Sequence, residues 1–166
     1  MISFDAQLTE EEFNLYNPAY CGFLLYSLIR SHEESSGRGI HCGLIYLMLP
    51  LILTKEILIS LPRNSKSSFV AWVTENEGML IDFPLRAESF FYISQTAQNF
   101  LIESKLISIS KDGYVNIIKK DLPKFPSLFN KSLYMKAQLT ASKLLGKWIS
   151  VSPSVETVYS VLGMRP

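Results

Sequence analysis

The stretch over residues 16–53 constrains the fold most, because it is more apolar than a lone small domain needs. Within it, residues 39–54 contain no Lys, Arg, Asp or Glu. A membrane-spanning helix needs about 20 such residues, and Pro50, which should bend or end a helix, lies inside this shorter run. We therefore expect buried helices here, packed in the domain's own core or against a partner protein.

Length and composition bound the chain to one ordinary domain. It has 166 residues, of which 48% are hydrophobic and 12% aromatic, so intrinsic disorder is not expected. There is no cationic start followed by an apolar core and a small-residue cleavage site, so secretion is not indicated. Cys21 and Cys42 have apolar neighbours, which is typical of buried thiols in a reducing compartment. We expect a cytoplasmic protein.

Local signals predict that most of the chain is helical. Thr9 and Glu12 form a capping box that should open a short helix. Asn17-Pro18 is a second helix start, and that helix should run to about Glu34. Further helices are expected near residues 41–53, 55–60, 65–78, 82–104, 130–149 and 152–163.

One β-hairpin interrupts this helical pattern. Residues 106–110 and 114–118 alternate or are β-branched, and they flank Asp112-Gly113. An Asp-Gly pair between two such stretches is a strong hairpin signal. The sequence therefore predicts two short antiparallel strands at this point.

The predicted fold is mainly α with one small β-hairpin, in a winged-helix-like helical domain. Residues 65–120 give the order helix, turn, helix, hairpin, which is the order of a winged helix. We expect a single domain over residues 1–166, with C-terminal helices at 128–166. The apolar stripe expected on the long C-terminal helix is Leu133, Ala137, Ala141, Leu144 and Trp148.

Sequence motifs for catalysis or metal binding are missing. Residues 35–39 (SSGRG) resemble a phosphate loop only loosely, because the Gly-Lys-Ser/Thr ending is missing. No nucleophile elbow and no His-Glu-x-x-His motif occurs. The only His and Cys residues, which lack zinc-site spacing, are Cys21, His32, His41 and Cys42. We expect no enzyme activity, no metal and no cofactor.

Charge is unevenly distributed along the chain. Residues 1–104 hold 6 Lys and Arg against 12 Asp and Glu, a net charge of −6. Residues 105–150 hold 9 Lys against 2 Asp, a net charge of +7. This asymmetry indicates either two faces for two partners or two halves that neutralise each other inside one fold.

Lysines form the candidate binding site, and a tryptophan lies next to the last of them. The site residues are Lys119, Lys120, Lys136, Lys143, Lys147 and Trp148. Three of these lysines follow helical spacing, within about 40° of one another. Residues 105–150 contain no Arg, so a nucleic-acid contact would be to the backbone and independent of sequence. A solvated helix face, an acidic protein partner and a nucleic-acid backbone all remain open.

Large apolar residues offer further candidates for partner contact. Trp72, Trp148, Tyr159 and Met164 could anchor an interface, with ordinary core packing as the alternative. The helix before the hairpin, near residues 84–104, has one basic residue against two acidic ones and is rich in Phe and Tyr. Such a helix is a poor reader of DNA and fits a buried or partner-facing position better.

Several stretches together resemble the middle component of three-component ABC systems, including the small middle subunit of Lamassu-type anti-phage complexes. They are residues 16–20 (YNPAY), 39–53, 61–63, 67–75 (SSFVAWVTE), 144–148 (LLGKW) and 157–166 (TVYSVLGMRP). The resemblance implies a non-enzymatic subunit between a coiled-coil SMC-like ABC-type ATPase and an effector, often a nuclease. It carries over no catalytic residue.

Two hypotheses follow. The first is an adaptor that bridges the ATPase and the effector in bacterial defence against phage or plasmid DNA, with possible sequence-independent DNA contact within the complex. The alternative is a stand-alone winged-helix regulator that binds DNA through the Lys-rich half, residues 105–150.

Overall fold

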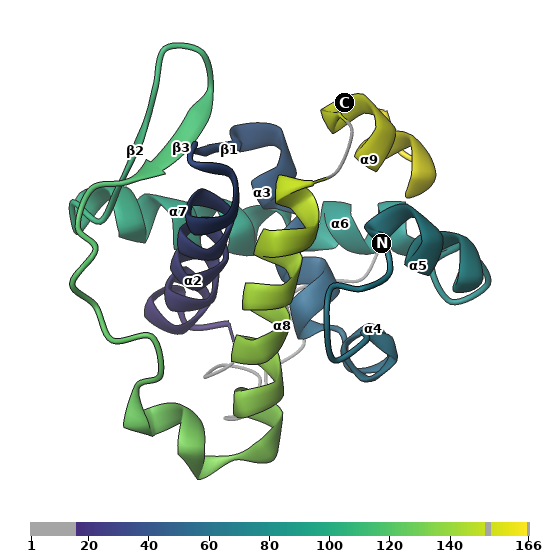
Figure 1. The fold of residues 1–166 in the computed structure, drawn as a ribbon, viewed down its shortest axis with the longest axis horizontal. Coiled ribbons are helices and arrows are strands. Elements are labelled where there is room, and N and C mark those ends of the chain that lie inside the picture. The colour runs from purple at the N-terminus through teal and green to yellow at the C-terminus, as the bar shows by residue number, and fades with distance from the viewer. Residues whose placement is uncertain (1–15, 152–153, 166) are drawn as a thin grey trace.

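The computed structural model describes residues 16–151 and 154–165, and most of these are helical (Figure 1). In chain order the elements are α2 (Pro18–Ser36), β1 (Ile40–His41), α3 (Cys42–Leu53), α4 (Lys55–Ser60), α5 (Phe69–Glu75), α6 (Phe83–Ser89), α7 (Phe91–Glu103), β2 (Ile107–Ile109), β3 (Tyr114–Ile117), η1 (Ser127–Lys131), α8 (Leu133–Ser150) and α9 (Val155–Val161). The predicted mainly α fold with a small β element is confirmed. The helix predicted near Thr9 lies outside the described residues.

Helix α2 is the central element, and its start follows the predicted signal. Asn17 Oδ1 accepts hydrogen bonds from the backbone N–H groups of Ala19 and Tyr20, and Pro18 occupies the first turn. Helices α7 and α8 both pack on α2, and Figure 1 shows α8 beside α2 with α7 crossing behind. The two contacts lie on opposite sides of α2, because Gly22 faces α7 and Ser31, nine residues on, faces α8.

The apolar run over residues 39–54 is buried in the protein's own core. Helix α3 continues through Pro50 to Leu53, so the proline does not end it, and Thr54 donates a hydrogen bond to the Pro50 carbonyl at 2.6 Å. Buried side chains of this helix include Leu44, Ile45, Leu47, Met48, Leu49, Leu51 and Ile52. The excess apolar character of this stretch therefore needs no partner to cover it.

The predicted hairpin forms, and it gains a third strand. Strands β2 and β3 are antiparallel, and Gly113 adopts φ +84° in the turn, a conformation that favours glycine. Strand β1 pairs with β3, with Ile40 opposite Val115, so the sheet order is β1-β3-β2. A two-residue strand has no periodic pattern, which explains why the sequence did not reveal it.

The single helix predicted near residues 82–104 is wrong in one respect, because the structure divides it at Phe90 into α6 and α7. Phe90 is buried and packs edge-on against the ring of Tyr16, at 5.8 Å between centroids. The preceding helix, α5, is shorter than the helix predicted near residues 65–78, and Ser68 caps it, since Ser68 Oγ accepts from Ala71 N–H at 3.1 Å.

Helix α8 begins later than predicted, and its apolar stripe differs at the start. Ser132 caps it by accepting from two backbone N–H groups, after the short helix η1. Leu133 is 87% exposed and Ala137 is also exposed, so the predicted stripe is wrong at these two positions. Gln138, in the second turn of α8, accepts a hydrogen bond from Tyr20, near the start of α2. The first turn of α8 therefore lies beyond this end of α2.

Candidate partner-binding surfaces

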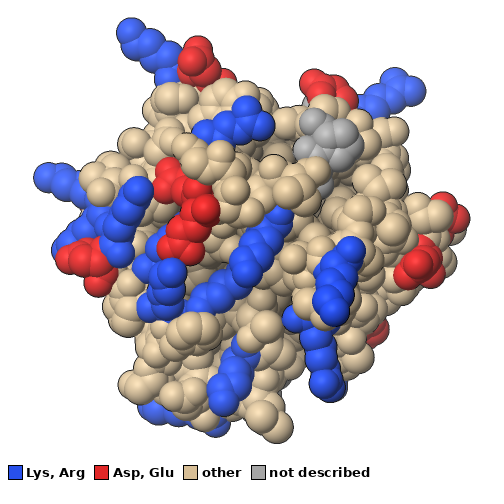
Figure 2. All heavy atoms as spheres, in the orientation of Figure 1, with Lys and Arg blue, Asp and Glu red and all other residues tan. Residues whose placement is uncertain are grey.

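Basic side chains gather on the face along which α8 runs. Figure 2 shows Lys and Arg over the lower part of this face, where η1 and the start of α8 lie in Figure 1. Residues 124–136 hold three Lys and no Asp or Glu. The charge asymmetry of the sequence therefore persists on the surface of the folded protein.

Residues 118–126 form the connector between β3 and η1. Lys119 and Lys120 lie in this connector, and both are exposed. Tyr26 donates a hydrogen bond to the Lys119 carbonyl at 2.6 Å, which fixes the backbone at this point. The Lys119 ammonium lies 3.9 Å from Asp121, with both side chains more than half exposed. An exposed ion pair of this kind is weak, so it does not hold Lys119 away from a partner. Lys119 and Lys120 are therefore both accessible.

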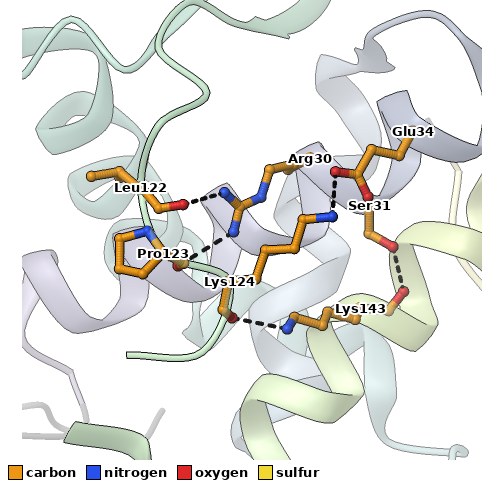
Figure 3. A network of polar contacts seen from close by, with 7 residues as sticks. All are labelled: Arg30, Ser31, Glu34, Leu122, Pro123, Lys124 and Lys143. Carbon is orange, nitrogen blue, oxygen red and sulfur yellow. Dashed lines mark hydrogen bonds and ion pairs between the residues drawn. The ribbon is translucent and has the colours of Figure 1, made fainter. Parts of the chain in front are cut away.

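A polar network holds the connector against α2 and α8 (Figure 3). Arg30 of α2 donates to the carbonyls of Leu122 and Pro123, at 2.6 and 3.4 Å. Lys143 of α8 donates to the Lys124 carbonyl at 2.9 Å. The Arg30 guanidinium is buried and also lies 5.0 Å from the centre of the Tyr26 ring. These contacts satisfy a buried charge and fasten the connector at the same time.

Lys143 differs from the other predicted lysines because its ammonium is already engaged. Its Nζ lies 3.1 Å from the centre of the Phe125 ring, a cation–π contact. Burial, together with the neighbouring charges of Arg30 and Lys124, lowers the pKa of Lys143 to about 8. The Lys143 ammonium therefore binds the connector within the chain, and it is less available to a partner than the exposed lysines.

Lys136 and Lys147 are exposed on α8, and eleven residues of helix separate them by about 16 Å. Trp148, by contrast, is 1% exposed. The centroid of its ring lies 5.9 Å from the ring centroids of both Phe69 and Trp72, and its Nε1 donates to the Ser67 carbonyl at 2.7 Å. The structure thus leaves two of these positions in solvent and places the tryptophan in the core.

The other predicted anchors also have contacts within the chain. Trp72 is buried, and its Nε1 donates to the Ser60 carbonyl at 3.1 Å. Tyr159 is half-buried and donates to the Gly43 carbonyl, and Met164 packs on the edge of the core. The structure therefore places Trp72 in the core and Tyr159 and Met164 against it, as in the core-packing alternative.

An apolar groove lies where the start of α2 meets η1 and α8, and the sequence did not reveal it. Its volume is about 960 Å³. The residues that line it are Asn17, Ala19, Tyr20, Phe23, Pro126, Leu128, Phe129, Ser132, Tyr134 and Met135. The buried Phe129 ring stacks on Tyr20 and lies tilted against Phe23, at 5.5 and 5.4 Å between ring centroids. The one signal in the sequence was the apolar residues of the Pro-containing segment 125–129 (FPSLF).

Three of the four polar side chains that line the groove have hydrogen-bond partners within the chain, and the fourth is Tyr134. Asn17 caps α2 and Ser132 caps α8. The Tyr20 hydroxyl donates to the Gln138 amide oxygen, and burial raises the pKa of this hydroxyl. The groove therefore presents apolar surface and offers few unused hydrogen-bonding groups.

A second surface, of mixed aromatic, aliphatic and amide side chains, lies on the outer side of α7. Tyr92 is 73% exposed, and Gln95, Asn99 and Ile102 follow it at spacings that place them on one helix face. Phe91 is half exposed and stacks on Tyr46 at 4.8 Å between centroids. Helix α7 contains no Lys or Arg. Helix α7 is therefore buried on one side and exposed on the other, and the partner-facing position expected for it stays a prediction.

Groups able to bind metal or to act as nucleophiles are scarce in the described part of the chain. Residues 16–151 and 154–165 contain no cluster of three His, Cys, Asp or Glu side chains that could hold a metal ion. Burial raises the pKa of the Cys21 thiol to about 12, so it is protonated at neutral pH and a poor nucleophile. None of the helices within these ranges is long and apolar enough to cross a membrane.

Comparison with known proteins gave one match. A family model described as ABC-three component (ABC-3C) system Middle Component 3 matches residues 5–166. No curated protein and no solved structure matched. The match covers nearly the whole chain and agrees with the resemblance seen in its sequence.

Proposed function

This chain belongs to the Middle Component 3 family of ABC-three component systems, and on that premise we propose that it is a non-enzymatic adaptor. It binds an SMC-like ABC-type ATPase at one surface and an effector, such as a nuclease, at another. The complex is cytoplasmic. Its setting is bacterial defence against phage or plasmid DNA, a role that rests on the resemblance to Lamassu-type complexes.

The observation that carries the adaptor role is the contrast between two exposed surfaces on either side of α2. The α7 surface presents Tyr92 and Ile102 beside the amide side chains of Gln95 and Asn99, and it carries no basic side chain. The surface formed by the connector, η1 and α8 is basic and contains an apolar groove. Interfaces of lasting complexes are apolar at the centre and rich in aromatic residues. Two surfaces of different charge fit two different partners.

The packing around α2 favours a rigid link between these surfaces. Helix α8 approaches α2 so closely that a Cβ at Gly146 would lie 2.4 Å from the Leu28 carbonyl oxygen. The α8 surface is therefore held firmly on α2, on which α7 packs from the opposite side. In the proposed cycle, binding restrains the effector, and a change of state in the ATPase on sensing foreign DNA releases it.

Co-purification of the chain with the ATPase and effector encoded beside it tests this role. Tyr92→Glu with Ile102→Glu should remove one partner, and Lys136→Glu with Lys147→Glu should remove the other. Ile59→Glu and Lys55→Glu, exposed positions on α4, are the matched controls and should keep both partners. A chain that purifies without either subunit, or variants that lose both partners together, would contradict the adaptor role.

DNA binding by the isolated chain is the second candidate function, favoured by the basic connector and α8. Helices α5, α6 and α7 followed by strands β2 and β3 keep the order that motivated the winged-helix hypothesis for residues 65–120. The helix that would enter the groove of DNA is α7, however, and it carries no basic side chain. Binding would therefore rest on lysine–phosphate contacts and should weaken steeply with salt. No measurable binding at low salt would remove this candidate.

A further inference from the structure

We propose that the apolar groove between α2, η1 and α8 receives an amphipathic helix of a partner subunit, with apolar side chains on one side and acidic side chains at its edges. This inference rests on the adaptor role proposed above and specifies the chemistry of one of its partners. It combines the groove lining with the charges on the segments that form the groove.

The lining favours a protein helix over a small polar ligand. Small-molecule sites combine apolar walls with a few polar groups that are free to orient the ligand. Here Asn17 and Ser132 cap helices and the Tyr20 hydroxyl is bonded to Gln138, so among the lining side chains only the Tyr134 hydroxyl is left to orient a ligand. An apolar helix face needs no such groups, because its own backbone hydrogen bonds are satisfied internally.

The shape and chemistry of the lining suit helix anchors spaced one turn apart. Phe129 is buried and its ring contacts those of Tyr20 and Phe23, so the lining contains a packed aromatic cluster. Leu128 is 46% exposed at the groove, and Met135 is only partly buried. Methionine adapts its shape to different partners, and exposed leucine gains from being covered.

The charges around the groove indicate that the partner is acidic. Residues 17–23 and 126–135, which supply the lining, contain Lys131 and no Asp or Glu, and Lys124 and Lys136 lie one or two residues outside the second segment. All three lysines are exposed. Lys124 pairs with Glu34 at 2.9 Å, but both side chains are more than half exposed and the pair can exchange. Acidic residues at the edge of a bound helix would meet these cations and set its orientation.

A peptide-binding experiment tests this chemistry on the isolated full chain. The probe is a labelled peptide of about four helical turns, with Leu at helical spacing on one side and Glu elsewhere. Two control peptides keep the length: one scrambles the Leu positions, and the other replaces Glu by Lys. Fluorescence anisotropy should show binding of the acidic amphipathic peptide that is at least about tenfold tighter than either control. Equal binding of all three peptides would overturn the proposal.

Variants of the chain locate the binding to the groove. Leu128→Glu, and separately Lys131→Glu with Lys136→Glu, should each weaken peptide binding by about tenfold or more. Ile59→Glu and Lys55→Glu make the same chemical changes on α4 and should bind like the wild type. Circular dichroism verifies that all variants keep the helical fold. Unchanged binding by Leu128→Glu would show that the peptide lies elsewhere and would overturn the proposal.

Photo-crosslinking from position 128 identifies the natural occupant. A photoreactive amino acid replaces Leu128 in the complex co-purified with the ATPase and the effector. The expected crosslink is to a helix of one partner subunit that carries acidic side chains. A crosslink within the same chain or to a second copy would overturn the proposal, as would no crosslink in an intact complex. If no complex forms, the adaptor role fails, and the peptide experiment still decides the chemistry of the groove.

Discussion

Helices α7 and α8 both pack on α2, from opposite sides, but the two contacts differ in how closely the backbones approach. At the α8 contact, a Cβ on Gly146 would lie 2.4 Å from the Leu28 carbonyl oxygen and 2.8 Å from Ser31 Cβ. At the α7 contact, a Cβ on Gly22 would lie 3.2 Å from a Phe100 ring carbon, at the end of a side chain that can move. The α8 contact is therefore the more rigid of the two.

The outer surfaces of the same two helices differ as well. Helix α7 presents aromatic, aliphatic and amide side chains without basic residues, whereas α8 presents lysines and its start borders an apolar groove. The comparison shows that close inner packing and outer binding chemistry are separate properties of a helix. The inner side depends on small residues, and the outer side remains available for partners.

The largest expected effect tests the buried end of α8 against the exposed side of α7. Trp148→Ala should reduce the free energy of unfolding by about 3–5 kcal/mol, because it leaves a cavity in the aromatic core. Phe100→Ala on α7 should have a clearly smaller effect, since Phe100 is more than one-third exposed. Urea denaturation measures both. Equal losses for the two variants would contradict the difference between the helices.

The next largest effect tests how closely the backbones of α7 and α8 approach α2. Gly146→Ala should reduce the free energy of unfolding by about 1–3 kcal/mol, because the new methyl group meets backbone atoms of α2. At an open helix position the same change would stabilise by about 0.5–1 kcal/mol. Gly22→Ala should cost less than Gly146→Ala, because only the Phe100 and Leu101 side chains must yield. Chemical denaturation of the two variants decides the order, and a Gly146→Ala variant as stable as wild type would refute it.

A smaller effect concerns the pH dependence of the α8 side. Burial lowers the pKa of Lys143 to about 8, below the usual lysine value of about 10.4. Between these two pH values the unfolded chain binds more protons at this site than the folded protein, so this site adds stability as pH rises. Wild type should therefore gain stability relative to Lys143→Met from about pH 8 to pH 10.

The gain at Lys143 should stay below about 1 kcal/mol, because the side chain is partly exposed to solvent. Urea titrations of both proteins at several pH values measure it, and titrations common to both cancel in the difference. Curves that run parallel across this range would show that the site does not contribute.

The smallest expected effect separates the start of α8 from its middle. Leu133→Ala should change the free energy of unfolding by less than about 0.5 kcal/mol, because Leu133 is exposed. Leu144→Ala, at a buried position of the same helix, should cost about 2–5 kcal/mol. Thermal or urea denaturation distinguishes the two. A large loss for Leu133→Ala would indicate that the first turn of α8 is packed in solution.

Much of the helical pattern could be predicted because its signals are local. Asn17-Pro18 starts a helix where predicted, and Asp112-Gly113 makes the hairpin turn. The side chains and backbone groups involved lie within a few residues of one another, so no distant contact is needed to interpret them. The expectation that the apolar stretch is buried is also confirmed, and its burial is within the protein's own core.

The candidate site was predicted less completely, because exposure depends on distant parts of the chain. The sequence identified the lysines but could not show that Lys143 is engaged by the connector or that Trp148 lies in the core. The alternatives were open because helical spacing shows only which residues share a face. Which face is covered depends on where α2 and the connector lie.

Composition, local caps and the Asp-Gly turn determined a mainly α domain with a hairpin, an uneven charge and no motif for catalysis. Only the tertiary structure decided that strand β1 joins the hairpin and that α8 touches α2 at Gly146. It also made the apolar groove, from residues 17–23 and 126–135. These segments are about a hundred residues apart in the chain, and no pattern within either one records that they meet.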